Sequence, residues 1–239
     1  MIHRYIKITF DTVYFITNYH TLFFYITYKY FSTMKSLSQF IIEKLKIQNT
    51  DSKPEHTLQP KDKKELIKMI KSEIKENGKE CSLNHIDTSL ITDMSMLFSN
   101  FKTFDGDISD WDVSNVKSMA HMFTHSKFTG KNSDISNWKT SGLTDLYKTF
   151  FMSKFEGDIS NWDVSNVTSL VGTFESSVFN GDLSKWDTSN VEVMDSTFAY
   201  SKFEGDISMW NVDNIKQHHS VFDNSPLHNK FEKQPKFKK

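Results

Sequence analysis

The chain has 239 residues, of which 37% are hydrophobic and 25% are charged, a composition typical of a soluble globular protein. Its formal net charge of −1 hides an uneven distribution: residues 81–229 hold 10 basic and 20 acidic side chains, whereas residues 230–239 hold 5 lysines and 1 glutamate. Residues 229–239 are therefore predicted to be a basic carboxyl-terminal tail. An acidic central region argues against nucleic acid as a partner, since phosphate neutralisation needs clustered Lys and Arg. The single cysteine, Cys81, excludes an internal disulfide and a zinc site built from cysteines.

Residues 1–33 form an aromatic-rich extension with only four charged side chains. A membrane-spanning helix needs roughly 20 predominantly apolar residues, and a cleavable signal peptide needs a compact apolar core followed by small residues. Neither description fits this segment well. Three alternatives stay open: an extension upstream of a native start at Met34, a segment that associates with a membrane, or a folded part of the protein.

Residues 34–60 are predicted to form an amphipathic helix followed by a linker. The stretch MKSLSQFIIEKLKI, residues 34–47, carries apolar side chains at helical spacing, and residues 48–60 are polar and contain two prolines. This stretch also faintly resembles the amino-terminal targeting peptides of some tailed-phage head proteins. Such a resemblance would imply a phage or gut-bacterial source.

A second helix is predicted over residues 61–77. Asp62 is placed to cap its amino terminus, and Gly78 is the expected stop. The first unit of a repeat follows directly, and the end of a repeat array exposes a hydrophobic surface. We therefore predict that residues 61–80 are a helical cap over that end.

Residues 81–228 are a tandem array. The sequence GDISDWDVSNV at 106–116 recurs four times with small changes, so the five tryptophans are 27, 24, 24 and 24 residues apart, at Trp111, Trp138, Trp162, Trp186 and Trp210. A fixed period of roughly 20 to 29 residues is typical of stacked coils that each hold one short strand and one return segment.

The unit at 159–179 predicts what each coil contains. Alternation at Trp162, Asp163 and Val164 predicts a strand with Trp and Val inward and Asp outward. The apolar spacing over 167–174 then changes to a helical period. The predicted fold class is therefore an α/β solenoid, a right-handed stack of about six strand–helix coils similar to leucine-rich repeats.

Repeated apolar positions predict columns of side chains through the stack. One phenylalanine column is Phe98, Phe123, Phe150, Phe174, Phe198 and Phe222, and the other is Phe104, Phe128, Phe155, Phe179 and Phe203. We assign a structural role to the five tryptophans and to the asparagines that follow the predicted strands, Asn115, Asn166, Asn190 and Asn214. The unit around Trp138 departs from the pattern, with an insertion at 131–133 and with Lys139 and Gly142 in place of Asp and Asn. That unit is expected to bulge.

The repeated GDIS-x-WDVSNV unit resembles the BspA-like leucine-rich repeat family of bacterial surface proteins, whose repeat also occurs in mycoplasma lipoprotein-associated proteins of unknown function. The resemblance covers about residues 61–228. It implies a non-enzymatic role in adhesion or protein binding, with attachment to a cell surface. The amino-terminal region has no lipobox cysteine and no wall-sorting signal follows Lys230, so cytoplasmic and phage-associated locations stay open.

The leading functional prediction is a protein-binding module that uses the concave strand face. Its predicted binding residues are the outward side chains of four coils, namely Asp110, Asp112, Ser114, Asn161, Asp163, Ser165, Lys185, Asp187, Ser189, Asn211 and Asp213. A purely structural scaffold would show the same repetition and remains an alternative. A calcium-stabilised surface repeat is another, although calcium needs six to eight oxygens that converge on one point.

An enzyme is the weakest prediction, because the histidines occupy no repeated position and no nucleophile or phosphate-binding motif is present. His121 and His125 have the spacing of two helical metal ligands but lack the Glu expected between them. We predict no cofactor, no metal site and no nucleic-acid partner. A protein is the expected partner, membrane association through 1–33 remains an alternative, and the oligomeric state is left open.

Overall fold

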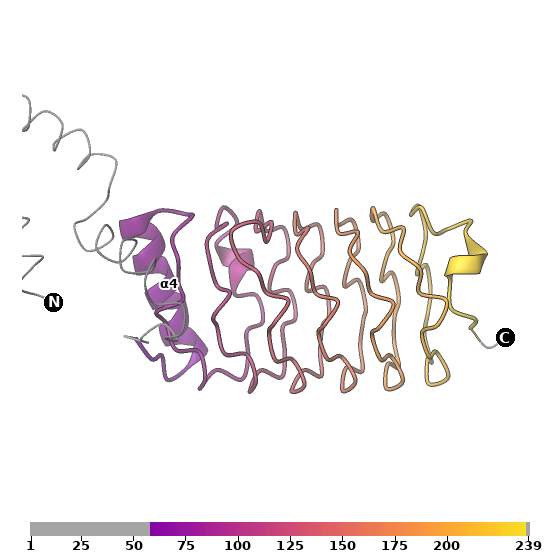
Figure 1. The fold of residues 1–239 in the computed structure, drawn as a ribbon, viewed down its shortest axis with the longest axis horizontal. Helices are drawn as coiled ribbons and strands as arrows, with labels where there is room; N and C mark the ends of the chain where they lie inside the picture. The colour runs from indigo at the N-terminus through magenta and orange to yellow at the C-terminus, as the bar shows by residue number, and fades with distance from the viewer. Residues whose placement is uncertain (1–57, 238–239) are drawn as a thin grey trace, which may run out of the picture. The chain divides into compact units, whose positions relative to one another are not determined.

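The computed structural model describes residues 58–237, which form one helix followed by a row of stacked coils (Figure 1). The chain divides into two compact units, Met1–Lys53 and Pro54–Lys239, and every described residue belongs to the second. The extension predicted for 1–33 lies outside the described residues. So does the region predicted as amphipathic helix and linker, apart from its last three residues, 58–60.

The single α-helix, α4, spans Lys63–Asn77 and lies against the first coil. The Asp62 carboxylate accepts a backbone N–H of the first turn at 2.8 Å, and Gly78, with φ 86°, follows the last turn. Leu66 and Ile70 are fully buried and belong to the same hydrophobic core as the first coil. The helix therefore covers one end of the core with its apolar side.

The predicted α/β solenoid of strand–helix coils is wrong. Beyond α4, the described residues contain only two short 3-10 helices, η1 (Phe98–Asn100) and η2 (Phe231–Lys233), and they contain isolated parallel bridges in place of strands. One line of bridges connects the coils through the six residues Asp93, Ser118, Asp145, Ser169, Val193 and Gln217. The coils thus stack in parallel register but are built from turns.

Closed turns explain the apolar spacing that suggested a helix. In the unit 159–179, the Val167 N–H donates to the Val164 carbonyl at 2.8 Å, and the Thr173 N–H donates to the Leu170 carbonyl at 3.1 Å. Each such turn brings residues i and i+3 to the same side of the backbone, as one turn of a helix also does. The predicted strand residues lie between two of these turns, although Trp162 and Val164 are buried and Asp163 is exposed, as alternation predicted.

Left-handed backbone conformations prevent a helix from continuing in the coils. Positive φ angles recur at two positions of the repeat, at Met96, His121, Lys148, Gly172, Ser196 and Ser220, and at His125, Met152, Ser176, Tyr200 and Asn224. A left-handed residue costs an L-amino acid roughly 1–2 kcal/mol. Hydrogen bonds to the next coil offset this cost: the N–H groups of His121 and Phe123 donate to the carbonyls of Tyr147 and Thr149 at 2.8 and 2.9 Å.

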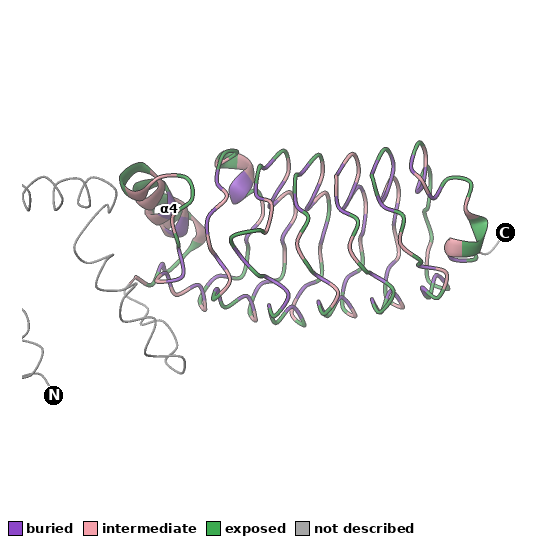
Figure 2. Cartoon of the chain, turned by 45° about the horizontal axis from the view of Figure 1, so that its top comes forward, coloured by how far each residue is buried: buried purple, intermediate pink, exposed green. Residues whose placement is uncertain are grey.

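The two predicted phenylalanine columns are confirmed and form the centre of the core. Neighbouring rings of the first column are 5.5–6.0 Å apart and nearly parallel, as Phe150 and Phe174 show with 5.6 Å and 3°. Within a coil the two columns touch, with 4.8 Å between Phe174 and Phe179. Full burial of each such ring contributes about 1.5–3 kcal/mol. Figure 2 shows buried and exposed positions alternating along every coil.

The glycine that opens four of the five tryptophan units is required by the second column, whereas the unit around Trp138 has Ser133 at this position. A Cβ atom on Gly181 would lie 2.7 Å from the Phe179 ring, and one on Gly205 would lie 2.5 Å from the Phe203 ring. Real Cβ atoms do not approach a ring so closely, and these rings are held by their neighbours in the column. The Gly-Asp pair therefore lets the ring pack against the backbone that leads into the next coil.

The insertion at 131–133 is folded onto the preceding coil. The Ser133 hydroxyl accepts the Ile108 N–H at 2.9 Å, and the Asn132 amide donates to the Asp105 carbonyl at 2.8 Å. Ser133 itself is buried. The extra residues thus supply hydrogen bonds to the coil before them.

Residues 229–237, predicted as part of a basic tail, pack on the last coil. The Ile207 N–H donates to the Lys233 carbonyl at 3.0 Å, next to η2. Pro235 is buried, and the Phe237 ring stacks on His218 at 4.3 Å. This segment covers part of the coil at the end opposite α4 (Figure 1).

Candidate interaction surface

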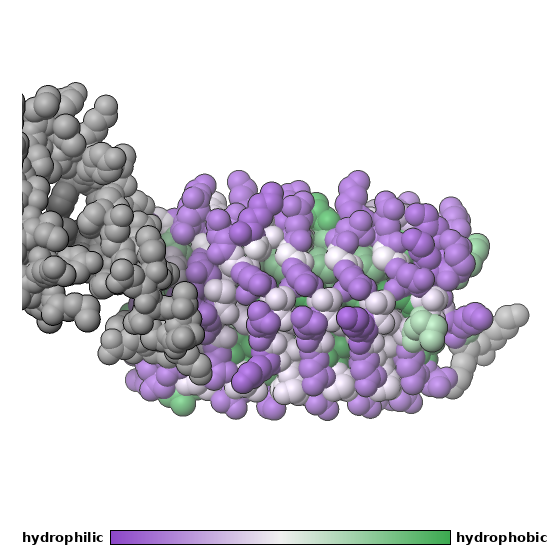
Figure 3. Space-filling model, viewed as in Figure 1, coloured by the Kyte–Doolittle hydropathy of each residue, from purple (hydrophilic) through white to green (hydrophobic). Residues whose placement is uncertain are grey.

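The predicted binding residues line up along one side of the coil stack, which we call the aspartate face. It consists of Asp110, Asp112, Ser114, Asn137, Lys139, Ser141, Asn161, Asp163, Ser165, Lys185, Asp187, Ser189, Met209, Asn211 and Asp213. All are exposed except the half-buried Ser114, Ser165 and Ser189. The face is built from turns, and the coils follow one another in a straight row, so it is neither a strand face nor concave (Figures 1 and 2). Hydrophilic side chains also form rows along the stack in Figure 3.

The aspartates of this face are bound to their own coils. The Asp112 carboxylate accepts the Ser114 N–H at 2.9 Å, and the Asp163 carboxylate accepts both the N–H and the hydroxyl of Ser165, at 3.0 and 2.6 Å. Asp187 accepts a serine N–H in the same way. Such local bonds stabilise a turn and fix the carboxylate direction. The face therefore presents charges whose directions are fixed by turn bonds, at positions where alternation predicted outward side chains.

The tryptophans beneath this face connect each coil to the one before it. Each indole N–H donates to a backbone carbonyl of the preceding coil, as the Trp162 indole does to Ile135 at 2.9 Å and the Trp210 indole does to Leu183 at 2.8 Å. Trp111, Trp138 and Trp186 make the corresponding bonds. All five rings are buried. They are structural side chains that hold the spacing between rows of the face.

The repeated asparagines also join neighbouring coils. Their side-chain amides donate to serine carbonyls of the preceding coil, at 2.6–3.0 Å, in the pairs Asn115–Ser89, Asn166–Ser141, Asn190–Ser165 and Asn214–Ser189. Gly142 occupies this position in the unit around Trp138. A Cβ atom there would lie 2.8 Å from the Ser114 carbonyl oxygen, so the departure from Asn matches a closer approach of the two coils.

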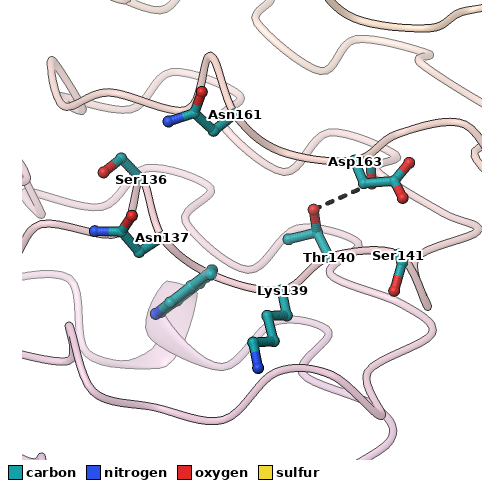
Figure 4. Close-up of a pocket in the computed structure, with 8 residues that line it drawn as sticks. Ser136, Asn137, Lys139, Thr140, Ser141, Asn161 and Asp163 are labelled. Carbon is teal, nitrogen blue, oxygen red and sulfur yellow. Dashed lines mark hydrogen bonds between the residues drawn. The ribbon is translucent and has the colours of Figure 1, made fainter.

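A groove of about 460 Å³ opens in the aspartate face at the unit that departs from the repeat (Figure 4). Its lining is Ser136, Asn137, Trp138, Lys139, Thr140, Ser141, Asn161 and Asp163. The Thr140 hydroxyl donates to the Asp163 carbonyl at 3.1 Å across the two coils, and Trp138 stacks on Trp162 at 5.9 Å. Lys139 places one positive charge where the coils on either side carry Asp112 and Asp163. The groove is therefore polar, of mixed charge, and has an aromatic side chain in its lining.

A second surface cluster brings His121 and His125 together with Tyr147, Lys148 and Phe151 of the next coil. The His121 ring meets Tyr147 edge-on at 5.1 Å, the His125 ring meets Phe151 edge-on at 5.4 Å, and the Lys148 ammonium lies 4.7 Å from the centre of the Phe151 ring. Burial, with Lys148 nearby, lowers the pKa of His121 below its ordinary value. The repeat register could have identified this cluster, because 121 and 148 are equivalent positions of neighbouring coils and Tyr147 and Phe151 lie close to 148 in the chain.

Acid should weaken the coils through the aspartate turns. The hydroxyl and the backbone N–H of Ser114 hold the pKa of Asp112 below its ordinary 3.8, and Ser189 does the same for the pKa of Asp187. A carboxyl group with a lowered pKa stabilises the fold above its unfolded pKa of about 3.9 and loses that contribution as pH falls through its folded pKa. We expect the melting temperature of wild type to fall between about pH 5 and about pH 3.

The double variant Asp112→Asn/Asp187→Asn keeps an oxygen acceptor for each turn but does not titrate. Thermal melts at a series of pH values should therefore show a smaller fall for this variant than for wild type. Parallel curves for the two proteins would show that these turns do not couple stability to pH.

Neither a metal cluster nor a membrane span emerges from residues 58–237. In this part of the chain no three His, Cys, Asp or Glu side chains converge on one point, and His121 and His125 belong to no such group. The same residues include no helix with the length and apolarity that crossing a membrane requires.

The repeat identifies the family of the chain. The model of the family described as "Mycoplasma protein of unknown function, DUF285" matches residues 64–151 and again residues 126–235. The two matches together span most of the chain, which belongs to this family. Comparisons with curated proteins and with solved structures gave no match. The family match agrees with the mycoplasma part of the resemblance found in the sequence, whereas the strand–helix geometry of a leucine-rich repeat does not describe these coils.

Proposed function

We propose that the coil stack is a non-enzymatic protein-interaction or adhesion module whose partner binds the aspartate face across the groove at Lys139. The observation that carries the proposal is this groove. Along the described coils, Lys139 is the one basic side chain at a position that otherwise holds Asp or Asn. A change of sign in a repeated row gives a partner a unique register on an otherwise repetitive surface.

The fixed positions of the side chains on the aspartate face support this role. Serine N–H groups fix the carboxylates, and buried tryptophans fix the distance between rows. A partner that binds such a surface loses little free energy in ordering it, which favours affinity. Exposed charges of the face contribute mainly to association rate and salt dependence. A purely structural scaffold needs neither the groove nor the change of sign.

The test compares two triple variants with matched chemistry. Asp112→Asn/Asp163→Asn/Asp187→Asn removes three charges from the aspartate face while keeping each turn acceptor. Its control, Asp158→Asn/Asp182→Asn/Asp206→Asn, removes three charges from exposed aspartates that accept serine N–H groups in the same way, at 2.8–2.9 Å, but lie outside the face. Both should melt close to wild type near neutral pH.

The three proteins serve as baits in parallel, together with Lys139→Asp. We expect wild type and the control triple variant to retain the same partner protein, and the aspartate-face triple variant and Lys139→Asp to lose it. Association of the captured partner with wild type should slow as salt rises. Retention of one identical set of proteins by all four baits would contradict the proposed face.

A further inference from the structure

Positive charge in the coil stack is concentrated in one place. Residues 81–229 hold 10 basic and 20 acidic side chains, but the segment 117–156 within them holds 6 basic and 3 acidic ones. This segment comprises the latter part of the coil of Trp111 and the whole coil of Trp138. The rest of the array holds 4 basic and 17 acidic side chains. The stack therefore attracts negative charge at this segment and repels it from the coils on either side.

Two lysines of the segment carry charges that nothing neutralises locally. The exposed Lys127 and Lys154 take part in none of the ion pairs found among residues 58–237. Each precedes a ring of the second phenylalanine column, and these two rings, Phe128 and Phe155, have their centres 5.9 Å apart. The Lys154 N–H also donates to the Ser126 carbonyl of the preceding coil at 3.2 Å. The two lysines thus start from adjacent backbone positions.

Large apolar side chains lie beside these lysines on the coil of Trp138. Tyr147 and Met152 are 37% and 45% exposed, and the Phe151 ring between them in the chain is half-buried. The next coil has smaller or polar side chains at the equivalent positions, namely Val171, Glu175 and Ser176. Packing of the coils therefore does not require large apolar side chains at these outward positions, and exposed apolar side chains that gather in one place mark an interaction site.

The rings of this coil are held in fixed positions around Lys148. Its ammonium lies 4.7 Å from the centre of the Phe151 ring and 5.8 Å from the centre of the Tyr147 ring. A Cβ atom on Gly172 of the next coil would lie 2.9 Å from Cγ of Lys148, so this glycine leaves room for the lysine stem. We call this region the lysine–aromatic surface, and it consists of Lys127, Tyr147, Lys148, Phe151, Met152 and Lys154.

We propose that the lysine–aromatic surface binds a short acidic segment of a partner protein. Carboxylates of that segment pair with Lys127 and Lys154, and a bulky apolar side chain of it packs against Tyr147 and Met152. Aromatic and methionine side chains are enriched at the centre of protein interfaces, and complementary charges around them guide association. The aspartate face attracts the opposite charge, so this proposal does not depend on the function proposed for that face.

A nucleic acid or an anionic membrane matches this surface less well than a short segment does. Both extend their negative charge well beyond one coil, and the acidic coils on either side would repel them. Residues 58–237 also contain no arginine, the side chain best suited to bidentate binding of phosphate. A localised group of carboxylates avoids both difficulties.

The test first lets the protein select its own ligand. The full chain serves as bait for a displayed library of random short peptides, and peptides that also bind the variant Lys127→Gln/Lys154→Gln are removed. The remaining peptides should be rich in Asp and Glu and should contain a bulky apolar residue such as Leu, Phe or Trp. The most enriched peptide is synthesised, and its affinity for the full chain is measured.

The variant Tyr147→Ala/Met152→Ser provides the independent measurement, because the selection already depends on the two lysines. It should weaken binding of the selected peptide about tenfold or more, as expected for removal of the central apolar contact. Neighbouring coils hold Ala120 and Ser176 at the equivalent positions, so the coil accepts these residue types. Thermal melts of both surface variants should lie close to wild type.

Two control variants change exposed side chains of the same types elsewhere on the stack, namely Lys185→Gln/Lys202→Gln and Tyr200→Ser/Met209→Ser. Both should bind the selected peptide as tightly as wild type does. The aspartate-face triple variant should bind it no more weakly, which separates this proposal from the one made for that face. Affinity for wild type should fall as salt rises, because the charges are exposed.

The proposal is wrong if no peptide depends on the two lysines, if those that do lack acidic residues, or if the surface and control variants bind alike. Vesicles that contain phosphatidylglycerol and a thymidine oligonucleotide are tested in parallel with the full chain. Binding of either one that is lost in Lys127→Gln/Lys154→Gln, without enrichment of an acidic peptide, would assign the surface to a membrane or to nucleic acid instead.

Discussion

Replacement of Trp162 by alanine should destabilise the protein by about 3–5 kcal/mol, the usual cost of removing a buried aromatic ring. The ring is 3% exposed, lies 5.9 Å from Trp138 and 6.0 Å from Phe150, and its indole N–H donates to the Ile135 carbonyl. Alanine would leave a cavity between two coils and would remove the shorter of the two hydrogen bonds that the Ile135 carbonyl accepts, the other coming from the Trp138 N–H at 3.3 Å. Chemical denaturation monitored by circular dichroism measures the loss.

Two matched variants separate the contributions. Trp162→Phe keeps an aromatic ring but loses the indole N–H, so it should cost less than the alanine variant. Asp163→Ala changes an exposed side chain one residue away from Trp162. It removes only the two hydrogen bonds to Ser165, each of which contributes about 0.5–1.5 kcal/mol or less in a solvated position. Asp163→Asn should be close to neutral. Equal losses for Trp162→Ala and Asp163→Ala would contradict the inward and outward assignment.

The sequence predicted how the coils stack better than it predicted their local backbone conformation. A period of 24 residues and the repeated Phe positions were sufficient to identify the aromatic columns, because equivalent side chains in stacked coils must meet. The local structure was mispredicted because apolar residues three apart lie on one side of both a helix and a series of closed turns. Val167 and Leu170 carry no sequence signal that distinguishes the two.

Residues with positive φ make the coils turns rather than helices. Most of them are not of a residue type that is typical of positive φ. Gly172 is the one glycine among these positions, whereas Lys148 and Tyr200 adopt positive φ because hydrogen bonds to the next coil outweigh the local cost. Tertiary interactions of this kind override local propensity.

The candidate groove lies at the one unit whose sequence departs from the repeat. Lys139 and Gly142 were recognised as departures from the repeat, and the structure places the groove at that unit. Its volume could not be predicted, because it depends on how far the coils of Trp138 and Trp162 separate on the exposed side. The aspartate turns could have been predicted, since Asp-x-Ser is a typical sequence for a side chain that accepts the N–H two residues on.

Removal of the helical cap should be the other change with a large effect. Leu66 and Ile70 of α4 are 0% exposed and belong to the core cluster that includes Leu83 and Ile86 of the first coil. Each alanine substitution should cost about 2–5 kcal/mol, and the double variant Leu66→Ala/Ile70→Ala should release the helix from the stack. The exposed apolar end should then promote aggregation, which size-exclusion chromatography detects. The control, Lys64→Ala/Lys68→Ala, changes two exposed positions of the same helix and should leave stability and size unchanged.

The position of the damage distinguishes a cap from a general contribution to stability. In a stack of coils each unit contacts mainly its neighbours, so loss of α4 should weaken the first coil most and the last coil least. Amide exchange in the double variant should therefore accelerate at Met94, Met96 and Phe98, whose N–H groups bond the second coil, before it accelerates at Met194, Ser196 and Phe198. Uniform acceleration along all coils would mean that the stack unfolds as one cooperative unit, and that α4 stabilises the whole of it rather than protecting its first coil.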